Sequence, residues 1–207
     1  MKIFSIEGNI GSGKSTLIEK LKKEIISTGG KKINYLPEPV DVWNEIKDRD
    51  NVTILEKYYA DSERYAFSFQ MMAYISRLSQ IRNNIKKGCV LITERCVFTD
   101  YHVFAKMLYD SGKISKIEYL IYKKWFDEFL KDLPIPIFIY VKTTPETCLK
   151  RVKKRNRKGE KIPLSYLQEC HNYHENWLNE TESDVLTLDG ENEISTMEII
   201  DFFLKQN

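Results

Sequence analysis

The stretch EGNIGSGKST, residues 7 to 16, decides how this chain begins. It follows the short apolar run Ile3 to Ile6 and leads directly into Leu17 to Leu21, which has helical spacing. Its residues 8 to 15 fit the pattern G-x-x-x-x-G-K-[ST] of a phosphate-binding loop. A strand before the pattern and a helix after it are the context that distinguishes such a loop from a chance match. The sequence therefore predicts a nucleotide-phosphate site at the N-terminus.

Each residue type in this loop has a physical task. Glycines let the backbone turn tightly and point its N–H groups at phosphate oxygens, and the following helix adds the positive end of its dipole. Lys14 would reach the outer phosphates, and the hydroxyl of Ser15 would bind Mg²⁺. The predicted nucleotide-binding residues of the loop are Gly8, Asn9, Gly11, Ser12, Gly13, Lys14, Ser15 and Thr16.

Length and composition favour one soluble domain spanning residues 1–207. The chain is 42% hydrophobic with a net charge of +2, and no apolar run approaches the roughly 18 residues that cross a bilayer. This charge balance indicates neither a nucleic-acid partner nor a membrane partner. Four scattered cysteines without a C-x-x-C pair predict reduced thiols and a cytoplasmic location. We expect no targeting segment, because the first predicted strand begins at residue 2.

Apolar runs alternate with amphipathic segments along the whole chain. Three of the runs are almost continuously apolar, which is typical of strands buried on both faces. The pattern predicts an α/β protein of the P-loop NTPase fold, with a five-stranded parallel sheet and helices on both faces. The predicted strands are residues 2–7, 32–37, 89–93, 135–142 and 184–188. The predicted helices are residues 15–28, 62–87, 97–110, 115–132, 144–156, 163–181 and 194–205.

Two acidic residues are predicted at the edge of the sheet where the loop lies. The strand VLITER ends at Glu94 and Arg95, and a carboxylate there can hold Mg²⁺. A surface ion pair is the alternative, but a P-loop in the same sheet favours function. The strand before YLPEPV places Glu38 between two prolines that stiffen its backbone. A rigid carboxylate beside a phosphate site suits an alcohol acceptor, whose proton must be removed. Glu38 therefore favours a nucleoside over a nucleoside monophosphate as the acceptor.

The chain lacks the N-K-x-D and D-x-x-G patterns of a GTP switch, and five blocks instead resemble the deoxyribonucleoside kinases. The blocks are GNIGSGKST, EPVDVW, ERYAFSFQ, ERCVFTDYHVF and LKRVKKRNR…IPLSYLQ…HENWL, in this order over nearly the whole chain. The resemblance implies a kinase of nucleotide salvage that transfers the γ-phosphoryl of ATP, or of another nucleoside triphosphate, to the 5′-hydroxyl of a deoxyribonucleoside. It also implies Mg²⁺, small-molecule nucleoside and nucleotide partners, and a homodimer.

The resemblance assigns roles to individual residues. Glu38 is similar to the base that takes the 5′-hydroxyl proton, Arg95 to its partner, and Glu94 with Ser15 to the Mg²⁺ ligands. Tyr59 resembles the residue that binds the 3′-hydroxyl and crowds the 2′ position. The implied substrate pocket is Glu38, Trp43, Leu55, Tyr58, Tyr59, Phe69, Gln70, Arg77, Arg95, Asp100, Phe104 and Glu160. Without the resemblance, most of the aromatic residues would be read as plain core.

Base preference rests on three of these residues. The amide of Gln70 offers one donor and one acceptor, which can match cytosine, adenine or thymine, so that Gln70 alone selects nothing. Arg77 and Asp100 together resemble the deoxycytidine and deoxyguanosine branch of the family. We expect deoxycytidine and purine deoxyribonucleosides to be preferred over thymidine.

The basic segment of about residues 151–163 resembles the lid of the family. Arg151, Arg155 and Arg157 repeat its R-x-x-x-R-x-R pattern, and guanidinium groups suit the charge of a transferring phosphoryl group. An exposed basic run that contacts nucleic acid is the alternative. The lid is one residue shorter than in the animal enzymes, which affects the assignment of Glu160 to the 3′-hydroxyl. Asp189, after the last predicted strand, resembles part of the family's loop over the nucleobase of the phosphoryl donor.

Two rival functions stay open at this point. A thymidylate-kinase-like enzyme, which phosphorylates a nucleoside monophosphate, would share the P-loop and the lid. A P-loop protein that binds nucleotide without phosphoryl transfer is the second rival. The sequence does not choose between ATP and UTP as the donor, nor does it fix the preferred deoxynucleoside.

Overall fold

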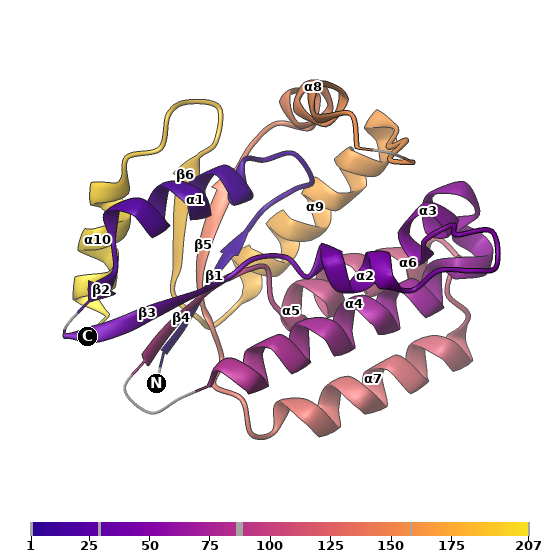
Figure 1. The fold of residues 1–207 in the computed structure, drawn as a ribbon, viewed down its shortest axis with the longest axis horizontal. Coiled ribbons are helices and arrows are strands. Elements are labelled where there is room, and N and C mark those ends of the chain that lie inside the picture. The colour runs from indigo at the N-terminus through magenta and orange to yellow at the C-terminus, as the bar shows by residue number, and fades with distance from the viewer. Residues whose placement is uncertain (1, 29, 86–88, 158, 207) are drawn as a thin grey trace.

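The computed structural model of the chain describes residues 2–28, 30–85, 89–157 and 159–206. Its centre is a six-stranded sheet with the order β2-β3-β4-β1-β5-β6 (Figure 1). β1 lies between β4 and β5 and is parallel to both, with Ile3 opposite Leu91 and Phe4 opposite Ile137. The strands are β1 Lys2–Glu7, β2 Ser27–Thr28, β3 Lys31–Leu36, β4 Cys89–Glu94, β5 Ile137–Lys142 and β6 Val185–Asp189.

Helices connect the parallel strands and cover the sheet. They are α1 Lys14–Glu24, α2 Val40–Glu45, α3 Ile54–Ala60, α4 Ser62–Asn84, α5 Val97–Thr99, the π-helix η1 Asp100–Ala105, α6 Lys106–Asp110, α7 Lys116–Leu130, α8 Pro145–Arg155, α9 Leu164–Glu180 and α10 Thr196–Lys205. In the part of the chain that the structure describes, no helix is both long enough and apolar enough to cross a bilayer.

The sheet is buried on both faces, as its apolar strands predict. Phe4 and Ile6 of β1 point to one face, which α1 and α10 cover with side chains such as Leu21 and Phe203. Ile3 points to the other face, where α4 packs. α9 also covers this second face, and α7 lies on the outer side of α4 (Figure 1). The alternation follows from the two-residue period of a strand.

The predicted α/β architecture is confirmed, but the predicted number of five strands is wrong. The sixth strand, β2, pairs antiparallel with β3 and lies within the range 15–28 that was expected to be helical. Two residues are too few to produce a recognisable alternation of polar and apolar side chains. The helices α2 and α3 were also not predicted, because with six and seven residues they span two turns or fewer and show little helical periodicity. The predicted helix 62–87 ends at Asn84, and its last two residues lie outside the described residues.

The predicted helix 97–110 is continuous but contains a π-helical part at residues 100–105. A π-helix bonds residue i to residue i+5, and such segments occur often at functional sites. The side-chain pattern of residues 97–110 carries no signal that distinguishes this hydrogen-bond spacing from that of an α-helix.

The fold brings three strand ends to one place. β1 ends at the phosphate-loop sequence, β3 ends before Glu38, and its neighbour β4 ends at Glu94. Because β1, β3 and β4 are parallel, their carboxyl ends lie at the same edge of the sheet. The chain order of the strands reverses at β1, which is where ligands bind in open α/β sheets.

Close packing at this edge requires glycine in the loop. Gly11 has φ +83°, and a Cβ there would lie 2.6 Å from the carbonyl oxygen of Cys148 and 3.0 Å from Val152 Cγ2. Gly112 has a similar φ of +76°, but a Cβ there would meet no described atom within 4 Å. The two glycines therefore share a left-handed backbone and differ in the space around them.

We predict that Gly11→Ala destabilises the protein more than Gly112→Ala. Both substitutions lose about 1–2 kcal/mol because an L-residue is forced into the left-handed region. Gly11→Ala should lose roughly 1–3 kcal/mol more, because its Cβ overlaps the backbone of α8. Urea unfolding of the two variants measures the difference, and an equal loss of stability would contradict the close approach of the loop to α8.

Candidate active site

A cavity of about 480 Å³ opens at the carboxyl edge of the sheet, a volume usual for a small-molecule site. It brings together most of the predicted site residues. Those in its wall are Gly11, Gly13, Lys14, Ser15, Thr16, Glu38, Trp43, Leu55, Tyr58, Tyr59, Phe69, Gln70, Arg77, Glu94, Arg95, Asp100, Phe104, Arg151, Arg155, Arg157 and Glu160.

Lys14 lies at the start of α1 and is buried, although it carries a charge. Its ammonium Nζ donates to the carbonyl oxygen of Asn9 at 2.7 Å, within the loop itself. Burial and the nearby Arg95 charge lower the pKa of Lys14 to about 8. The carboxylates of Glu94 and Glu38 act in the opposite direction. The ammonium is therefore a cation at neutral pH that lies close to losing its charge.

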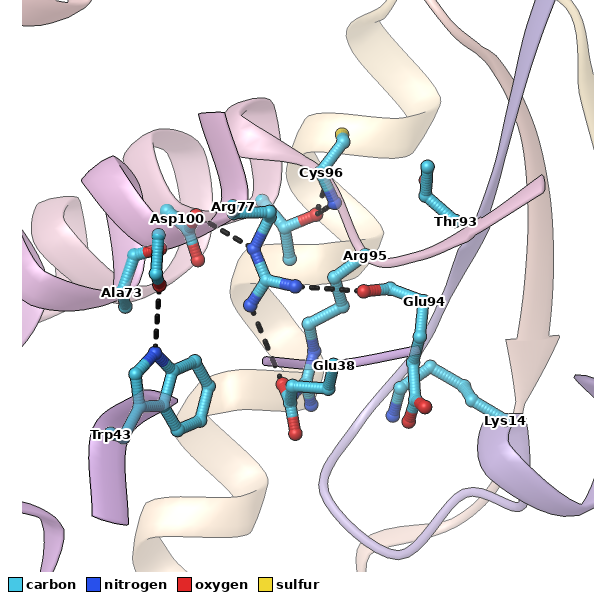
Figure 2. A network of polar contacts seen from close by, with 12 residues as sticks. Lys14, Glu38, Trp43, Ala73, Arg77, Thr93, Glu94, Arg95, Cys96 and Asp100 are labelled. Atoms are coloured by element: carbon cyan, nitrogen blue, oxygen red, sulfur yellow. Dashed lines mark hydrogen bonds and ion pairs between the residues drawn. The ribbon is translucent and has the colours of Figure 1, made fainter. Parts of the chain in front are cut away.

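Glu38 is held by two buried guanidinium groups (Figure 2). Arg95 Nη1 donates to Glu38 Oε1 at 2.7 Å, and Arg77 Nη2 approaches the same oxygen at 3.4 Å. Among the described residues, no hydrogen bond reaches the second oxygen, Oε2. One carboxylate oxygen is thus occupied by cations, while the other is free to accept a hydrogen bond in the cavity.

The charges around Glu38 set its protonation state. Burial by itself raises the pKa of Glu38, but Arg95, Arg77 and Lys14 outweigh it and lower the pKa to about 2. The carboxylate is therefore an anion at every physiological pH. Pro37 and Pro39 stiffen the chain on either side, and the amide of Val40 donates to the Glu38 carbonyl at 2.8 Å.

Arg77 connects Glu38 with β4 and with Asp100 of η1. Its Nε donates to Asp100 Oδ2 at 2.9 Å, and its Nη1 donates to the backbone carbonyl of Glu94 at 2.7 Å (Figure 2). Burial raises the pKa of Asp100, and the guanidinium of Arg77 opposes this rise. Asp100 belongs to η1, which also carries Phe104 into the cavity wall. The guanidinium of Arg95 lies 5.0 Å from the Phe104 ring centre.

Oxygen ligands suitable for Mg²⁺ meet beside the phosphate loop. Ser15 Oγ donates to Glu94 Oε1 at 2.7 Å, so that the hydroxyl and the carboxylate lie next to each other. Mg²⁺ prefers oxygen ligands, and it commonly takes only one or two protein groups and completes its shell with water and phosphate. The donor set at this point therefore fits the ion that the sequence predicts.

Aromatic side chains form the wall opposite the phosphate loop. Trp43 meets Phe69 edge-on with ring centres 5.4 Å apart, and Tyr58 stacks on Phe69 at 4.8 Å. The indole N–H of Trp43 donates to Ser76 Oγ at 2.9 Å, which fixes the ring. Gln70 is buried in the same wall, and its Oε1 has no hydrogen-bond partner among the described residues. A buried amide oxygen without a partner is costly unless a ligand satisfies it.

The basic segment approaches the cavity from α8. Arg151 Nη1 donates to the carbonyl of Ser12 at 3.0 Å, which connects it to the phosphate loop. Arg155 Nη2 donates to both carboxylate oxygens of Glu160, at 2.6 and 2.7 Å. The Tyr59 hydroxyl donates to Glu160 Oε1 at 3.5 Å. Glu160 thus lies in the cavity between Arg155 and Tyr59. Residue 158 of the predicted lid lies outside the described residues.

Four predicted residues lie outside the cavity wall. Asn9 donates from Nδ2 to the carbonyl of Leu167 at 2.8 Å and so fixes the loop to α9. Ser12 is buried behind the loop, and Gly8 accepts a hydrogen bond from Arg95 Nη2 at its carbonyl. Asp189 is exposed at the end of β6 and accepts from the amide of Glu191 at 2.9 Å. Gly8, Asn9 and Ser12 do not line the cavity; their hydrogen bonds join the phosphate loop to Arg95, α9 and Arg151.

Sequence reasoning missed several residues of the wall, namely Ile10, Pro37, Val40, Ala73 and Tyr166. Tyr166 is the most notable, because its hydroxyl lies 2.9 Å from that of Tyr58. It belongs to the quoted block IPLSYLQ, and its helical spacing resembles that of a core residue. Only the contact of Tyr166 in α9 with Tyr58 in α3 shows that Tyr166 lines the cavity and is not simply a core residue.

Comparison with known proteins identifies the family. The family model described as deoxynucleoside kinase matches residues 4–202. A fowlpox virus protein named "Probable deoxycytidine kinase" is 40% identical over 185 residues, which cover 86% of this chain and 72% of the relative. Human deoxycytidine kinase is 35% identical over 201 residues, covering 86% of this chain and 75% of the relative.

A third relative has a different named substrate. Human mitochondrial thymidine kinase 2 is 32% identical over 179 residues, which cover 85% of this chain. The chain spans 64% of the length of that relative. Because the family model covers nearly all of the strands, helices and cavity residues described above, the comparisons and the geometry agree: the chain belongs to the deoxynucleoside kinase family.

Proposed function

We propose that the chain transfers the γ-phosphoryl group of ATP, or of another nucleoside triphosphate, to the 5′-hydroxyl of a deoxyribonucleoside, as in nucleotide salvage. The observation that carries this proposal is the free oxygen of Glu38 in a cavity that also holds the phosphate loop. A phosphoryl acceptor with a hydroxyl group needs such a proton acceptor, whereas an acceptor phosphate does not.

The proposed reaction is a single displacement at phosphorus. The 5′-oxygen forms a bond to the γ-phosphorus while the bond from that phosphorus to the β–γ bridging oxygen breaks. The 5′-hydroxyl proton passes to Glu38, and the nucleoside diphosphate leaves. Lys14 and Arg95, with Arg151, Arg155 and Arg157 of the lid, would stabilise the negative charge on the phosphoryl oxygens. Ser15 and Glu94 would hold Mg²⁺, which neutralises phosphate charge when it is bound.

Asp100 supports a preference for bases with an exocyclic amino group. Its Oδ2 accepts from Arg77, and Asp100 lines the same cavity as Gln70. Cytosine, adenine and guanine each carry an exocyclic amino donor, whereas thymine carries none and presents the acceptor O4. A carboxylate attracts the first and repels the second. We therefore propose that deoxycytidine and purine deoxyribonucleosides are better substrates than thymidine.

The rival functions fit less well. Neither the family nor the relatives favour a thymidylate-kinase-like enzyme. The Glu38 carboxylate would also repel an acceptor phosphate at the position where the hydroxyl is proposed to bind. A nucleotide-binding module without phosphoryl transfer would have no use for a charged Glu38 held between two buried arginines, an arrangement that is costly to maintain.

An exposed apolar surface supports a homodimer. Ile117, Leu120, Ile121 and Trp125 of α7 are 43–72% exposed, and their spacing places them on one stripe of the helix. Ile75 of α4 is also exposed. We propose that these residues meet a second copy of the chain. Sedimentation equilibrium should then give twice the chain mass of 24.5 kDa, and a monomer at micromolar concentration would contradict the proposal.

The four free cysteines support a reducing, cytoplasmic location.

A panel of acceptors tests the proposed function. With ATP as donor, kcat/KM for deoxycytidine should exceed that for thymidine by about tenfold or more, because a mismatched hydrogen-bonding edge costs about 1–3 kcal/mol. Deoxycytidine monophosphate, offered in parallel, should not be phosphorylated. Thymidine as the best acceptor would contradict the base preference, and turnover of the monophosphate alone would contradict the kinase proposal.

Glu38→Gln should lower kcat by about 10²–10⁴-fold, because the amide keeps the shape of the side chain and cannot take the proton. Binding of a non-hydrolysable ATP analogue should not weaken, since Glu38 is not proposed to touch the donor and the substitution removes a negative charge near it. Glu45→Gln, on the exposed end of α2, is the matched control and should keep the wild-type rate. Unchanged turnover in Glu38→Gln would remove Glu38 from the mechanism.

The low pKa of Lys14 predicts an alkaline loss of activity. The ammonium attracts phosphate only while it is protonated, so kcat/KM for ATP should fall as pH rises through about 8 in the free enzyme. Lys14→Arg keeps its charge to much higher pH, because the pKa of a guanidinium lies above about 12. Profiles of kcat/KM from pH 6 to 10 should therefore lose this alkaline limb in the variant. An unchanged limb in Lys14→Arg would assign it to another group.

A further inference from the structure

The fully buried carboxylate of Glu7 lies at the end of β1, immediately before the phosphate loop, and outside the cavity wall. Its Oε1 accepts from Ser5 Oγ at 2.5 Å and from Cys96 Sγ at 3.3 Å, and its Oε2 accepts from Thr99 Oγ1 at 2.6 Å. Within the described residues, Glu7 forms no ion pair. Burying a carboxylate on neutral donors alone is expensive, so the arrangement calls for a reason.

The partners of Glu7 surround the backbone of Arg95. Arg95 has φ +60°, a left-handed conformation that costs a non-glycine residue about 1–3 kcal/mol. Its own amide donates to the carbonyl of Ile6 at 3.0 Å. The next residue, Cys96, donates from its amide to Thr99 Oγ1 at 3.3 Å and from its thiol to Glu7. Two successive residues of β1 thus hold the strained turn. Ile6 binds the amide of Arg95, and Glu7 binds the side chains of Cys96 and Thr99.

The hydrogen bonds around Thr99 run in one direction. Its hydroxyl accepts from the Cys96 amide and donates to Glu7, so that Glu7 must be an acceptor at this point. The thiol of Cys96 is also a donor, because burial raises its pKa and keeps it protonated. A carboxylate can accept all three hydrogens, whereas an amide side chain would turn a donor toward one of them.

The turn fixes the two groups that flank Glu38. The side chain of Arg95 extends from the turn and donates to Glu38, and the backbone carbonyl of Glu94 accepts from Arg77 (Figure 2). A small rotation of the turn would therefore move both guanidinium groups. The carboxylate of Glu7 also lies near enough to favour the charged forms of Lys14, Arg77 and Arg95, against the larger opposing effect of burial.

We infer that Glu7 is a positioning residue, which acts through Thr99 and Cys96 to hold the strained turn that presents Arg95 to Glu38 and to the transferring phosphoryl group. The inference rests on the proposed kinase function. It concerns kcat more than substrate binding, because the contacts of Arg95 with the phosphoryl group gain most strength in the transition state.

Deleting the hydroxyl of Thr99 tests this inference. Thr99→Val keeps the shape of the side chain and removes the donor to Glu7. It should lower kcat about tenfold, while KM for the nucleoside and for ATP each change less than about threefold. Thr99→Ser restores the hydroxyl and should return kcat to within about twofold of wild type. Ser183→Ala is the control, because it deletes a hydroxyl that donates at 2.6 Å to the carbonyl of Pro136, remote from the cavity.

A purely structural role would give a different pattern. Thr99→Val and Ser183→Ala would then lower the unfolding midpoint alike and leave the kcat of the folded enzyme alike, which would overturn the inference. If Thr99→Val does not fold, Cys96→Ala and Cys96→Ser form the second pair, with the alanine variant expected to lose kcat and the serine variant to keep it. A wild-type chain that phosphorylates no nucleoside overturns the proposed function and this inference together. An active wild type with an unaffected Thr99→Val overturns the inference alone.

Discussion

The whole site depends on one partly buried carboxylate shared by two buried arginines. Glu38 follows β3, Arg95 follows β4, and Arg77 comes from the middle of α4. Three separate parts of the chain are thus bound to one another by charge at the edge of the sheet. Because removing one partner of such a group leaves an uncompensated buried charge, the three side chains stabilise each other's positions. The geometry of the site is therefore set by the protein before any substrate arrives.

The same charges that hold Glu38 in place make it a weak base in the unliganded protein. A pKa of about 2 means that Glu38 has little affinity for a proton. A bound triphosphate would compete for Arg95 and Lys14, and it would bring its own negative charge close to the carboxylate. Both effects favour the protonated form and raise the pKa of Glu38. Proton affinity would then develop when the donor is present, which suits a base whose proton should move only during transfer.

How much could be predicted from the sequence depended on how local the signal is. The phosphate loop, the buried strands and the proline-bracketed Glu38 are written in contiguous residues, and the sheet edge follows from them. β2 has only two residues, and η1 differs from an α-helix only in hydrogen-bond spacing, so neither leaves a pattern. The inward or outward direction of Asn9 is decided by α9, which is distant in the sequence. The hydrogen bonds of Glu7 with Cys96 and Thr99 also join residues that are distant in the sequence, so no local pattern predicts them.

Glu160 gives the two halves of the cavity a common component. It contacts Arg155, which is proposed to bind the triphosphate, and Tyr59, which is proposed to bind the sugar. A shift of this carboxylate would change both contacts. Under the proposed function, donor and acceptor binding would therefore be coupled through one side chain, and by reciprocity each ligand would alter the affinity of the other by the same factor.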